Sequence, residues 1–235
     1  MKIALIGCGR MGRLIEQRAP DHGGEVVLRL DSTNNAGGAG LTAENFRGVD
    51  VALEFTKPDA AVTNLEHLAA LGVPAVTGTT GWHGELERVR CAVARHHAGL
   101  VWSANFSVGV QVFTRLAAEA ARLLRDQADY GVWAREIHHH TKKDAPSGTL
   151  LHLVGVMRAA GYERSIDRSA IRAGAHPGLH EIGFDSPADS ITLCHTARNR
   201  EGFVHGALKA ARWIAERRTG FHEFGDILFG GASCS

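Results

Sequence analysis

The sequence predicts an α/β protein, with an N-terminal Rossmann-type parallel sheet and a second α+β domain built on a mixed, open-faced sheet. Two observations predict this fold class. Short apolar runs alternate with amphipathic stretches over roughly the first 100 residues, which is typical of parallel strands joined by helices. After Asn105, strand-like runs follow one another instead, as they do in an antiparallel or mixed sheet.

Five strands are expected in the first half of the chain. They correspond to short apolar runs at residues 2–6, 25–30, 49–55, 73–77 and 100–103. The amphipathic stretches between them predict helices at 13–19, 56–71 and 82–97. Either the Thr56 hydroxyl or the Asp59 carboxylate is expected to cap the second of these helices. The alternation predicts right-handed crossovers in a parallel sheet.

The second half begins with one long helix, expected at residues 106–125. Its apolar residues recur on one face, namely Val110, Phe113, Leu116, Ala117 and Ala120. Further strands are expected at 130–138, 170–173, 179–184 and 190–196, and further helices at 147–160 and 203–217. We therefore expect one domain at 1–104, a second at 105–205, and a C-terminal segment of about 206–235 that returns to the first.

The composition excludes several classes of protein. The 235 residues include 26 Lys plus Arg and 25 Asp plus Glu, and this near-neutral balance argues against a nucleic-acid-coating protein. No window approaches the roughly 18 consecutive apolar residues of a membrane helix. The N-terminus is broken by glycine too early for a secretory signal peptide. The four cysteines show no metal or disulfide spacing. We expect a cytoplasmic protein with no nucleic-acid or membrane partner.

Gly7, Gly9 and Gly12 form a G-x-G-x-x-G motif directly after the first strand. The first glycine permits a tight turn, the second lets the backbone approach a pyrophosphate, and the third lets helix and strand pack closely. Asp31 ends the second strand, where a carboxylate would accept hydrogen bonds from an adenosine ribose. We therefore expect a dinucleotide site.

The same region favours NADH slightly over NADPH. Neither of the two residues after Asp31 is Arg or Lys, so a 2′-phosphate would meet a carboxylate without a basic neighbour in sequence. Arg10 and Arg13 remain alternative sources of positive charge.

Two further loops follow strands of the expected parallel sheet. Gly78, Thr79 and Thr80 come after the fourth strand, and Ala104, Asn105 and Phe106 come after the fifth. Ligands of such sheets bind beyond the carboxyl ends of the strands, so these loops are expected to border a nicotinamide. A plain turn explains either loop nearly as well.

Residues 136–149 read EIHHHTKKDAPSGT. We expect no metal site, because successive strand residues point to opposite faces and three adjacent histidines do not easily share one ion. A solvated basic turn is one alternative. The sharper hypothesis is an acid and anion site, in which a histidine donates a proton and Lys142 supplies a fixed charge. A helix beginning near Ser147 would help to hold a carboxylate.

Six blocks of the sequence resemble the 4-hydroxy-tetrahydrodipicolinate reductase (dihydrodipicolinate reductase) family. They are IGCGRMGR (6–13), EFTKPDA (54–60), GTTGW (78–82), SANFSVGV (103–110), EIHHHTKKDAPSGT (136–149) and HTARNREGFVHGALKAARWI (195–214). The fifth block is by far the most discriminating. The resemblance implies NAD(P)H-dependent reduction of 4-hydroxy-tetrahydrodipicolinate to tetrahydrodipicolinate, in lysine and diaminopimelate biosynthesis.

The resemblance also implies roles for single residues. His138 would be the acid/base group, Lys142 would hold or polarise the substrate, and Gly148 and Thr149 would bind a substrate carboxylate beside His139. The implied cofactor-binding residues are Gly7, Gly9, Arg10, Met11, Gly12, Asp31, Gly78, Thr79, Thr80, Ala104, Asn105 and Phe106. Residues 105–205 would bind the small dicarboxylate substrate and assemble a homotetramer through their sheet.

Two alternatives stay open. One is another small two-domain NAD(P)-dependent oxidoreductase, such as an aspartate dehydrogenase, because the glycine motif is shared by every dinucleotide-binding fold. The other is a non-catalytic dinucleotide-binding sensor that kept the fold. Intact His138 and Lys142 count against the sensor, which would have no need of a proton donor.

Overall fold

The computed structural model describes residues 1–216 and 218–230. By its internal contacts the chain divides into two units. The first unit contains Met1–Ser107 together with the described residues from Phe203 onward, and the second is the continuous segment Val108–Gly202. The last residue of the helix expected at 203–217 lies outside the described residues, as do residues 231–235 of the C-terminal segment.

The first unit is built on a six-stranded sheet in the order β10-β5-β4-β3-β1-β2, and every adjacent pair is parallel. Its strands are β1 (Lys2–Ile6), β2 (Glu25–Leu30), β3 (Val51–Glu54), β4 (Ala75–Thr77), β5 (Gly99–Trp102) and β10 (Gly220–Glu223). The predicted parallel sheet is therefore confirmed. The C-terminal segment was expected to return here without a strand of its own, whereas its strand β10 pairs with β5.

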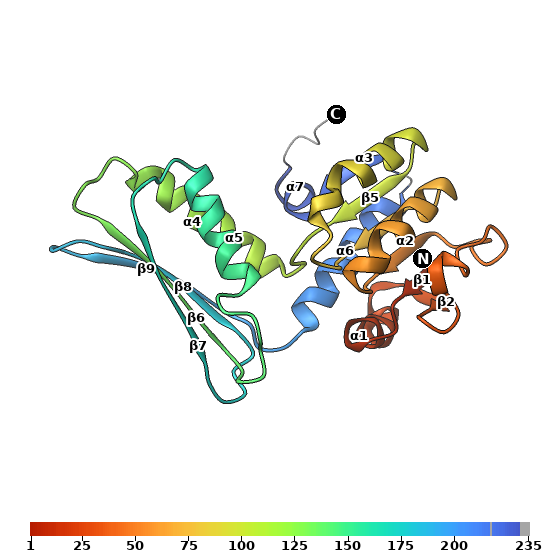
Figure 1. Ribbon diagram of the computed structural model, residues 1–235, viewed down its shortest axis with the longest axis horizontal. Coiled ribbons are helices and arrows are strands. Elements are labelled where there is room, and N and C mark those ends of the chain that lie inside the picture. The colour runs from red at the N-terminus through yellow and green to blue at the C-terminus, as the bar shows by residue number, and fades with distance from the viewer. Residues whose placement is uncertain (217, 231–235) are drawn as a thin grey trace. The chain divides into compact units, whose positions relative to one another are not determined.

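Helices cover both faces of this sheet (Figure 1). They are α1 (Arg10–Arg18), α2 (Pro58–Ala70), α3 (Leu86–Arg95), α6 (Glu201–Ala215) and α7 (Phe224–Phe229), with short 3₁₀ turns at Pro20–His22, Ala36–Gly38 and His83–Glu85. Alternate strand residues pack on opposite helices. Ala4 and Ile6 join the core with α2 and α3, whereas Ile3 and Leu5 join the core with α1 and α6.

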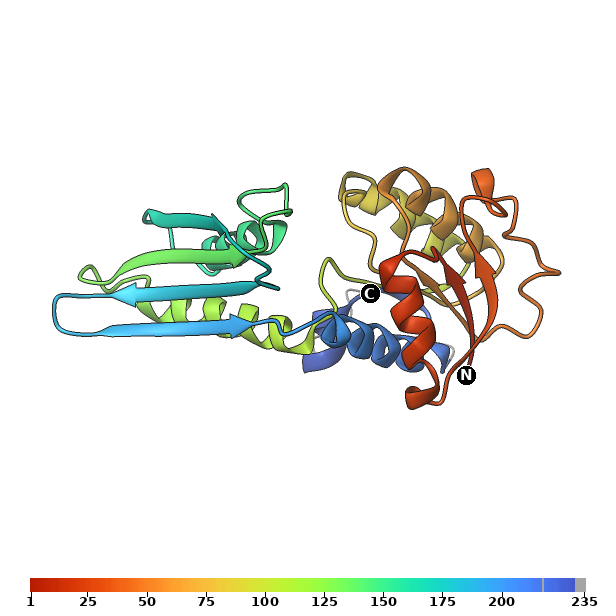
Figure 2. The ribbon, with the colours of Figure 1, turned by 90° about the horizontal axis from the view of Figure 1, so that it is seen from below.

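The second unit is a four-stranded mixed sheet in the order β7-β6-β8-β9. Its strands are β6 (Gly131–His138), β7 (Ile166–Arg172), β8 (Leu179–Asp185) and β9 (Ser190–Thr196). β6 and β7 are parallel and the other two pairs are antiparallel, which confirms the predicted mixed sheet. Helices α4 (Val108–Leu124) and α5 (Gly148–Ala159) lie against one face (Figure 1), and the β8–β9 hairpin is clear in Figure 2.

Two local expectations were wrong. Helix α2 has Lys57 as its N-cap and no side chain caps it, so neither Thr56 nor Asp59 has that role. Leu116 does not share the buried face of α4, because Leu116 is 52 % exposed whereas Phe113 and Ala117 are buried. At about 3.6 residues per turn, the position before Ala117 is rotated by more than a quarter turn away from the core.

Candidate active site

The glycine motif forms a tight turn between β1 and α1. Gly7 has a φ of +99°, and a Cβ there would collide with the carbonyl of Phe55. A Cβ on Gly12 would collide with the carbonyl of Gly7, so this glycine permits the close packing of helix and strand. A Cβ on Gly9 would meet nothing within 4 Å. The second glycine therefore presents its backbone to open space, as a bound pyrophosphate requires.

The N-terminus of α1 has the character of an anion site. Its N-cap is Gly9, no side chain caps it, and its first turn contains no acidic residue. The amide groups of this turn are thus left for a ligand, and the helix dipole favours a negative one. Arg10 is exposed beside them, while Met11 packs partly into the core. These features fit the pyrophosphate of a dinucleotide such as NAD(P)H.

Asp31 follows β2 and is held by its own loop. Its Oδ1 accepts hydrogen bonds from the Thr33 hydroxyl at 2.6 Å and from the Thr33 amide at 2.8 Å. These bonds lower the pKa of the Asp31 carboxyl. The side chain is therefore an ionised acceptor at the carboxyl end of β2, which suits a ribose hydroxyl.

A buried carboxylate fixes the loops after β3 and β4. Glu54 is fully buried and accepts hydrogen bonds from the Thr56 hydroxyl, from the Thr56 amide at 3.1 Å and from the Thr77 hydroxyl at 2.5 Å. The Thr56 amide also donates to Thr79 Oγ1 at 2.8 Å. This network ties Gly78, Thr79 and Thr80 to the carboxyl end of the sheet. Glu54 was not among the predicted site residues, although an acid inside an apolar run was the available signal.

The three residues after β5 that were predicted to border a nicotinamide differ in their exposure to solvent. Ala104 is exposed, Asn105 is half-buried, and Phe106 is only 2 % exposed. The Phe106 ring packs against Phe224 with centroids 4.9 Å apart. Its side chain therefore belongs to the core of the first unit and not to an exposed surface that a ligand could contact.

In the second unit, strand alternation puts polar side chains on the buried face of β6. Val132 and Ala134 pack in the core, and Glu136 and His138 continue the same face. Glu136 pairs across the antiparallel ladder with His180 of β8, and His138 pairs along the parallel ladder with Arg172 of β7. Residues far apart in sequence are thus gathered at one end of the sheet.

Glu136 is the centre of this cluster and is fully buried. Its Oε1 accepts hydrogen bonds from the Ser147 amide at 2.8 Å and from Arg172 Nη2 at 2.7 Å. Its Oε2 accepts from the Ser147 hydroxyl and lies 3.3 Å from His180 Nε2 and 3.5 Å from His138 Nδ1. Burial raises the pKa of the Glu136 carboxyl, but the bonds from Ser147 and Arg172 outweigh burial and hold that pKa below its ordinary value.

His138 is 8 % exposed at the end of β6. Burial lowers its pKa, the nearby Glu136 carboxylate opposes that change, and Lys142 and Arg172 add to it. The imidazole is therefore poised to lose a proton easily, as a donor to substrate must.

Lys142 and the N-terminus of α5 lie within the same segment. Lys142 Nζ bonds both carboxylate oxygens of Asp144, at 2.8 and 2.9 Å. Ser147 is the N-cap of α5 and accepts a hydrogen bond from the Leu150 amide, while Gly148 and Thr149 open the helix. A Cβ on Gly148 would meet nothing within 4 Å, so its backbone faces open space. His139, by contrast, bonds the Thr141 hydroxyl at 2.6 Å.

Glu136, His138 and His180 have ligand atoms within 4.8 Å of one another. The donor set does not suit a resident metal, because both carboxylate oxygens already accept hydrogen bonds and one of them faces the Arg172 guanidinium. The cluster is better described as a hydrogen-bonded acid–base centre.

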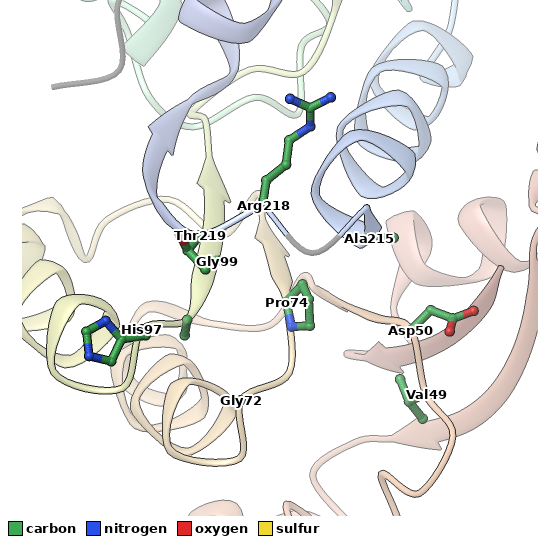
Figure 3. Close-up of a pocket in the computed structure, with 10 residues that line it drawn as sticks. Val49, Asp50, Gly72, Pro74, His97, Gly99, Ala215, Arg218 and Thr219 are labelled. Atoms are coloured by element: carbon green, nitrogen blue, oxygen red, sulfur yellow. The ribbon is translucent and has the colours of Figure 1, made fainter. Parts of the chain in front are cut away.

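A pocket of about 400 Å³ lies elsewhere, at the amino ends of strands in the first unit (Figure 3). Asp50, Pro74, His97, Arg218 and Thr219 are among its lining residues. None of the residues predicted to bind cofactor or substrate lines it. It is therefore separate from the loops at the carboxyl ends of these strands, where ligands of parallel sheets bind.

Comparison with known proteins connects both units to one family. The family model for the N-terminus of dihydrodipicolinate reductase matches residues 1–106, and the model for its C-terminus matches residues 109–228. The 4-hydroxy-tetrahydrodipicolinate reductase of Christiangramia forsetii is 33 % identical over 97 % of this chain and 98 % of its own. The enzyme of that name from Archaeoglobus fulgidus is 34 % identical over 97 % of this chain and 100 % of its own.

A solved structure has the same fold. The dipicolinate-bound dihydrodipicolinate reductase from Paenisporosarcina sp. TG-14 superimposes with a TM-score of 0.78, covering 95 % of this chain and 97 % of that one. The two sequences are 20 % identical, so this likeness speaks for the two-domain architecture.

Proposed function

The chain belongs to the dihydrodipicolinate reductase family, and we propose that the cluster around His138 is the centre at which it reduces its substrate. The protein is an NAD(P)H-dependent oxidoreductase that converts 4-hydroxy-tetrahydrodipicolinate to tetrahydrodipicolinate in lysine and diaminopimelate biosynthesis. The single observation that supports the centre best is the grouping of His138, Lys142 and the α5 N-terminus in one short segment.

Each group in this segment has one task. Once the 4-hydroxyl group has left the substrate as water, bound NAD(P)H would supply a hydride to the cyclic, unsaturated ring that remains. The electron pair then left on the ring needs a proton, which His138 Nε2 donates, because Nδ1 is buried on the Glu136 side. Lys142 Nζ supplies a positive charge for one substrate carboxylate. At the positive end of α5, the amide groups of Gly148 and Thr149 would hold a carboxylate, and the Gly148 amide already hydrogen-bonds Asp144.

The glycine turn and the loops at the carboxyl ends of β2, β4 and β5 would hold the cofactor. Gly7, Gly9, Arg10, Met11 and Gly12 would lie at the pyrophosphate. Asp31 would accept the ribose hydroxyls, and the loops at Gly78–Thr80 and 104–106 would border the nicotinamide. An ionised Asp31 repels a 2′-phosphate, so we infer a slight preference for NADH.

The open face of the second unit's sheet supports a homotetramer. Trp133, Ile137 and Ile171 lie on the face opposite Val132 and Ala134, and Ile171 is 41 % exposed. Such partly exposed apolar side chains are typical of a surface covered by another subunit.

Within the described residues, no helix is long and apolar enough to span a membrane. We place the enzyme in the cytoplasm.

Steady-state kinetics test this function. The purified protein is mixed with NADH or NADPH and with substrate generated enzymatically from pyruvate and aspartate semialdehyde, and nicotinamide absorbance is followed. We expect cofactor oxidation that depends on both components, with a higher kcat/KM for NADH. Oxidation no faster than the background without protein would contradict the reductase function. A higher kcat/KM for NADPH would contradict only the cofactor preference.

A further inference from the structure

We propose that Glu136 is a positioning residue for His138. Its carboxylate fixes the imidazole ring and keeps a proton on Nδ1, so that Nε2 is the nitrogen that serves the substrate. The proposal rests on the proposed function, in which His138 is the proton donor, and it assigns a role to a residue that never touches the substrate.

Strand geometry places the two side chains together. Glu136 and His138 are two residues apart on β6 and therefore share its buried face. Nδ1 of His138 is buried and, within the described part of the chain, has no hydrogen-bond partner. Glu136 Oε2 lies 3.5 Å from it. Closing this gap to a charge-assisted hydrogen bond requires a movement of only about 0.6–0.8 Å.

The carboxylate is itself held in a fixed position. Ser147 donates two hydrogen bonds to it, from its amide and its hydroxyl, and Arg172 donates a third. Ser147 also caps α5, so the carboxylate is tied to the helix whose first residues face the substrate. A rigid carboxylate can orient an imidazole ring, whereas a mobile one would let it turn.

Charged and titratable groups face His138 from several elements. Glu136 comes from β6, Arg172 from β7 and His180 from β8, and Lys142 and Asp144 come from the loop before α5. Burial lowers the pKa of His138, and so do the two cations, whereas the two carboxylates raise it. Glu136 therefore keeps the imidazolium form available to higher pH.

These opposite influences give a test that a purely structural role would not pass. His138 must be protonated to act, so the rate falls as pH rises through its pKa. Glu136→Gln removes a negative charge and should move this descending limb to lower pH. Arg172→Gln removes a positive charge and should move it to higher pH. Damage to packing alone would not shift the limb in two directions.

The size of the effect is a second criterion. In Glu136→Gln we expect kcat to fall by about 10- to 100-fold, as for other residues that orient a reactive side chain, while KM for NADH changes little. Glu181→Gln is the matched control, because this carboxylate lies on β8 and pairs with Arg135 instead. The control should keep the kcat and pH profile of the unaltered enzyme.

Nitrogen NMR of His138 tests the tautomer directly and needs no turnover. Its signals are identified by their loss in His138→Gln. In the unaltered protein above the pKa we expect the proton on Nδ1, and in Glu136→Gln we expect a mixture of tautomers. If Glu136→Gln does not fold, the spectrum of the unaltered protein and the pH profile of Arg172→Gln still test the proposed role of Glu136.

The proposal is overturned if the proton of neutral His138 resides on Nε2, or if Glu136→Gln folds and keeps its kcat and pH profile. A limb that moves to lower pH in Arg172→Gln would also overturn it. These outcomes differ from a failure of the proposed function, in which the unaltered enzyme is inactive or His138→Gln keeps full activity.

Discussion

Both oxygens of the Asp144 carboxylate accept hydrogen bonds from Lys142, the residue proposed to meet a substrate carboxylate. Burial raises the pKa of Asp144, but Lys142 and backbone hydrogen bonds from Asp144 and Gly148 together outweigh burial and hold that pKa below its ordinary value. A substrate carboxylate must therefore replace, or share Lys142 with, a carboxylate of the protein itself. This competition is a property of single residues and can be altered without changing the fold.

Asp144→Asn should tighten binding of a dicarboxylate. The Lys142 and Asp144 side chains are 25 % and 56 % exposed, so their pairing is worth little, about 0.2–1 kcal/mol. We expect the Kd of dipicolinate, measured by calorimetry, to fall by up to about fivefold. A higher Kd in Asp144→Asn would mean instead that Asp144 aligns Lys142 for the ligand. Glu181→Gln is again the control.

His180 should make stability depend on pH. Burial, with smaller contributions from His138 and His195, lowers its pKa from 6.5 to about 4. Between those values the unfolded chain binds a proton that folded His180 does not, so stability is complete above pH 6.5 and is lost as pH falls toward 4. Over this pH range, the shifted pKa of His180 lowers the free energy of unfolding by about 3 kcal/mol.

Urea unfolding between pH 7 and pH 4 measures this loss. The free energy of unfolding should fall less steeply in His180→Gln than in the unaltered protein. Equal slopes in the two proteins would show that His180 is not held neutral by the fold.

Much of the candidate site could be predicted from the sequence because several of its residues lie in one short motif. His138, Lys142, Gly148 and Thr149 lie within one motif, which runs from the end of β6 to the start of α5. Arg172 and His180 could not be found this way, since only strand pairing brings them to Glu136. Glu136 did carry a signal, because it occupies a buried-face position in an alternating strand.

At the scale of elements, Ser147 connects a helix to the site. It caps α5 through the Leu150 amide and donates two hydrogen bonds to Glu136. Ser147→Ala removes the cap and leaves a buried carboxylate with one donor fewer. We expect a loss of about 1–3 kcal/mol in the free energy of unfolding, measured by urea denaturation.

Ser147→Thr is the matched control, because threonine keeps the hydroxyl and should retain most of the stability. If Ser147→Ala were as stable as the unaltered protein, the hydroxyl would not be needed by either α5 or Glu136.

Element prediction succeeded where the local pattern was sufficient. The strands expected at 2–6, 25–30 and 190–196 have those bounds in the structure, and the other expected strands differ at their ends, most of all that at 170–173, where β7 begins four residues earlier. β10 was missed because a four-residue strand carries little pattern of its own and becomes a strand by pairing with β5. The predicted N-cap of α2 was wrong for a related reason. Thr56 uses its hydroxyl for Glu54 and leaves Lys57 as the N-cap.

At the scale of the whole molecule, the family was predicted from six motifs and is confirmed by matches over both halves of the chain. The predicted fold class is confirmed as well, with a parallel and a mixed sheet. The residues proposed to bind the cofactor lie on the first unit, and the proposed proton donor lies on the second.

Assembly is tested at the open face of the second unit's sheet. Ile171→Lys places a charge on this face, and we expect the proposed homotetramer to dissociate, because burying an unpaired charge is costly. Light scattering coupled to size-exclusion chromatography measures the mass. Arg168→Lys, on β7 but exposed and already charged, should leave it unchanged. An unaltered mass for Ile171→Lys would exclude this face as the interface.

The most direct test of the account is the turnover of His138→Gln with NADH and substrate. Because glutamine keeps the polarity but cannot supply the proton near neutral pH, we predict a fall in kcat of about 100-fold or more. KM for NADH should stay nearly unchanged, and the folded state should persist by circular dichroism. A folded His138→Gln variant with the kcat of the unaltered enzyme would contradict the central claim that His138 is the proton donor.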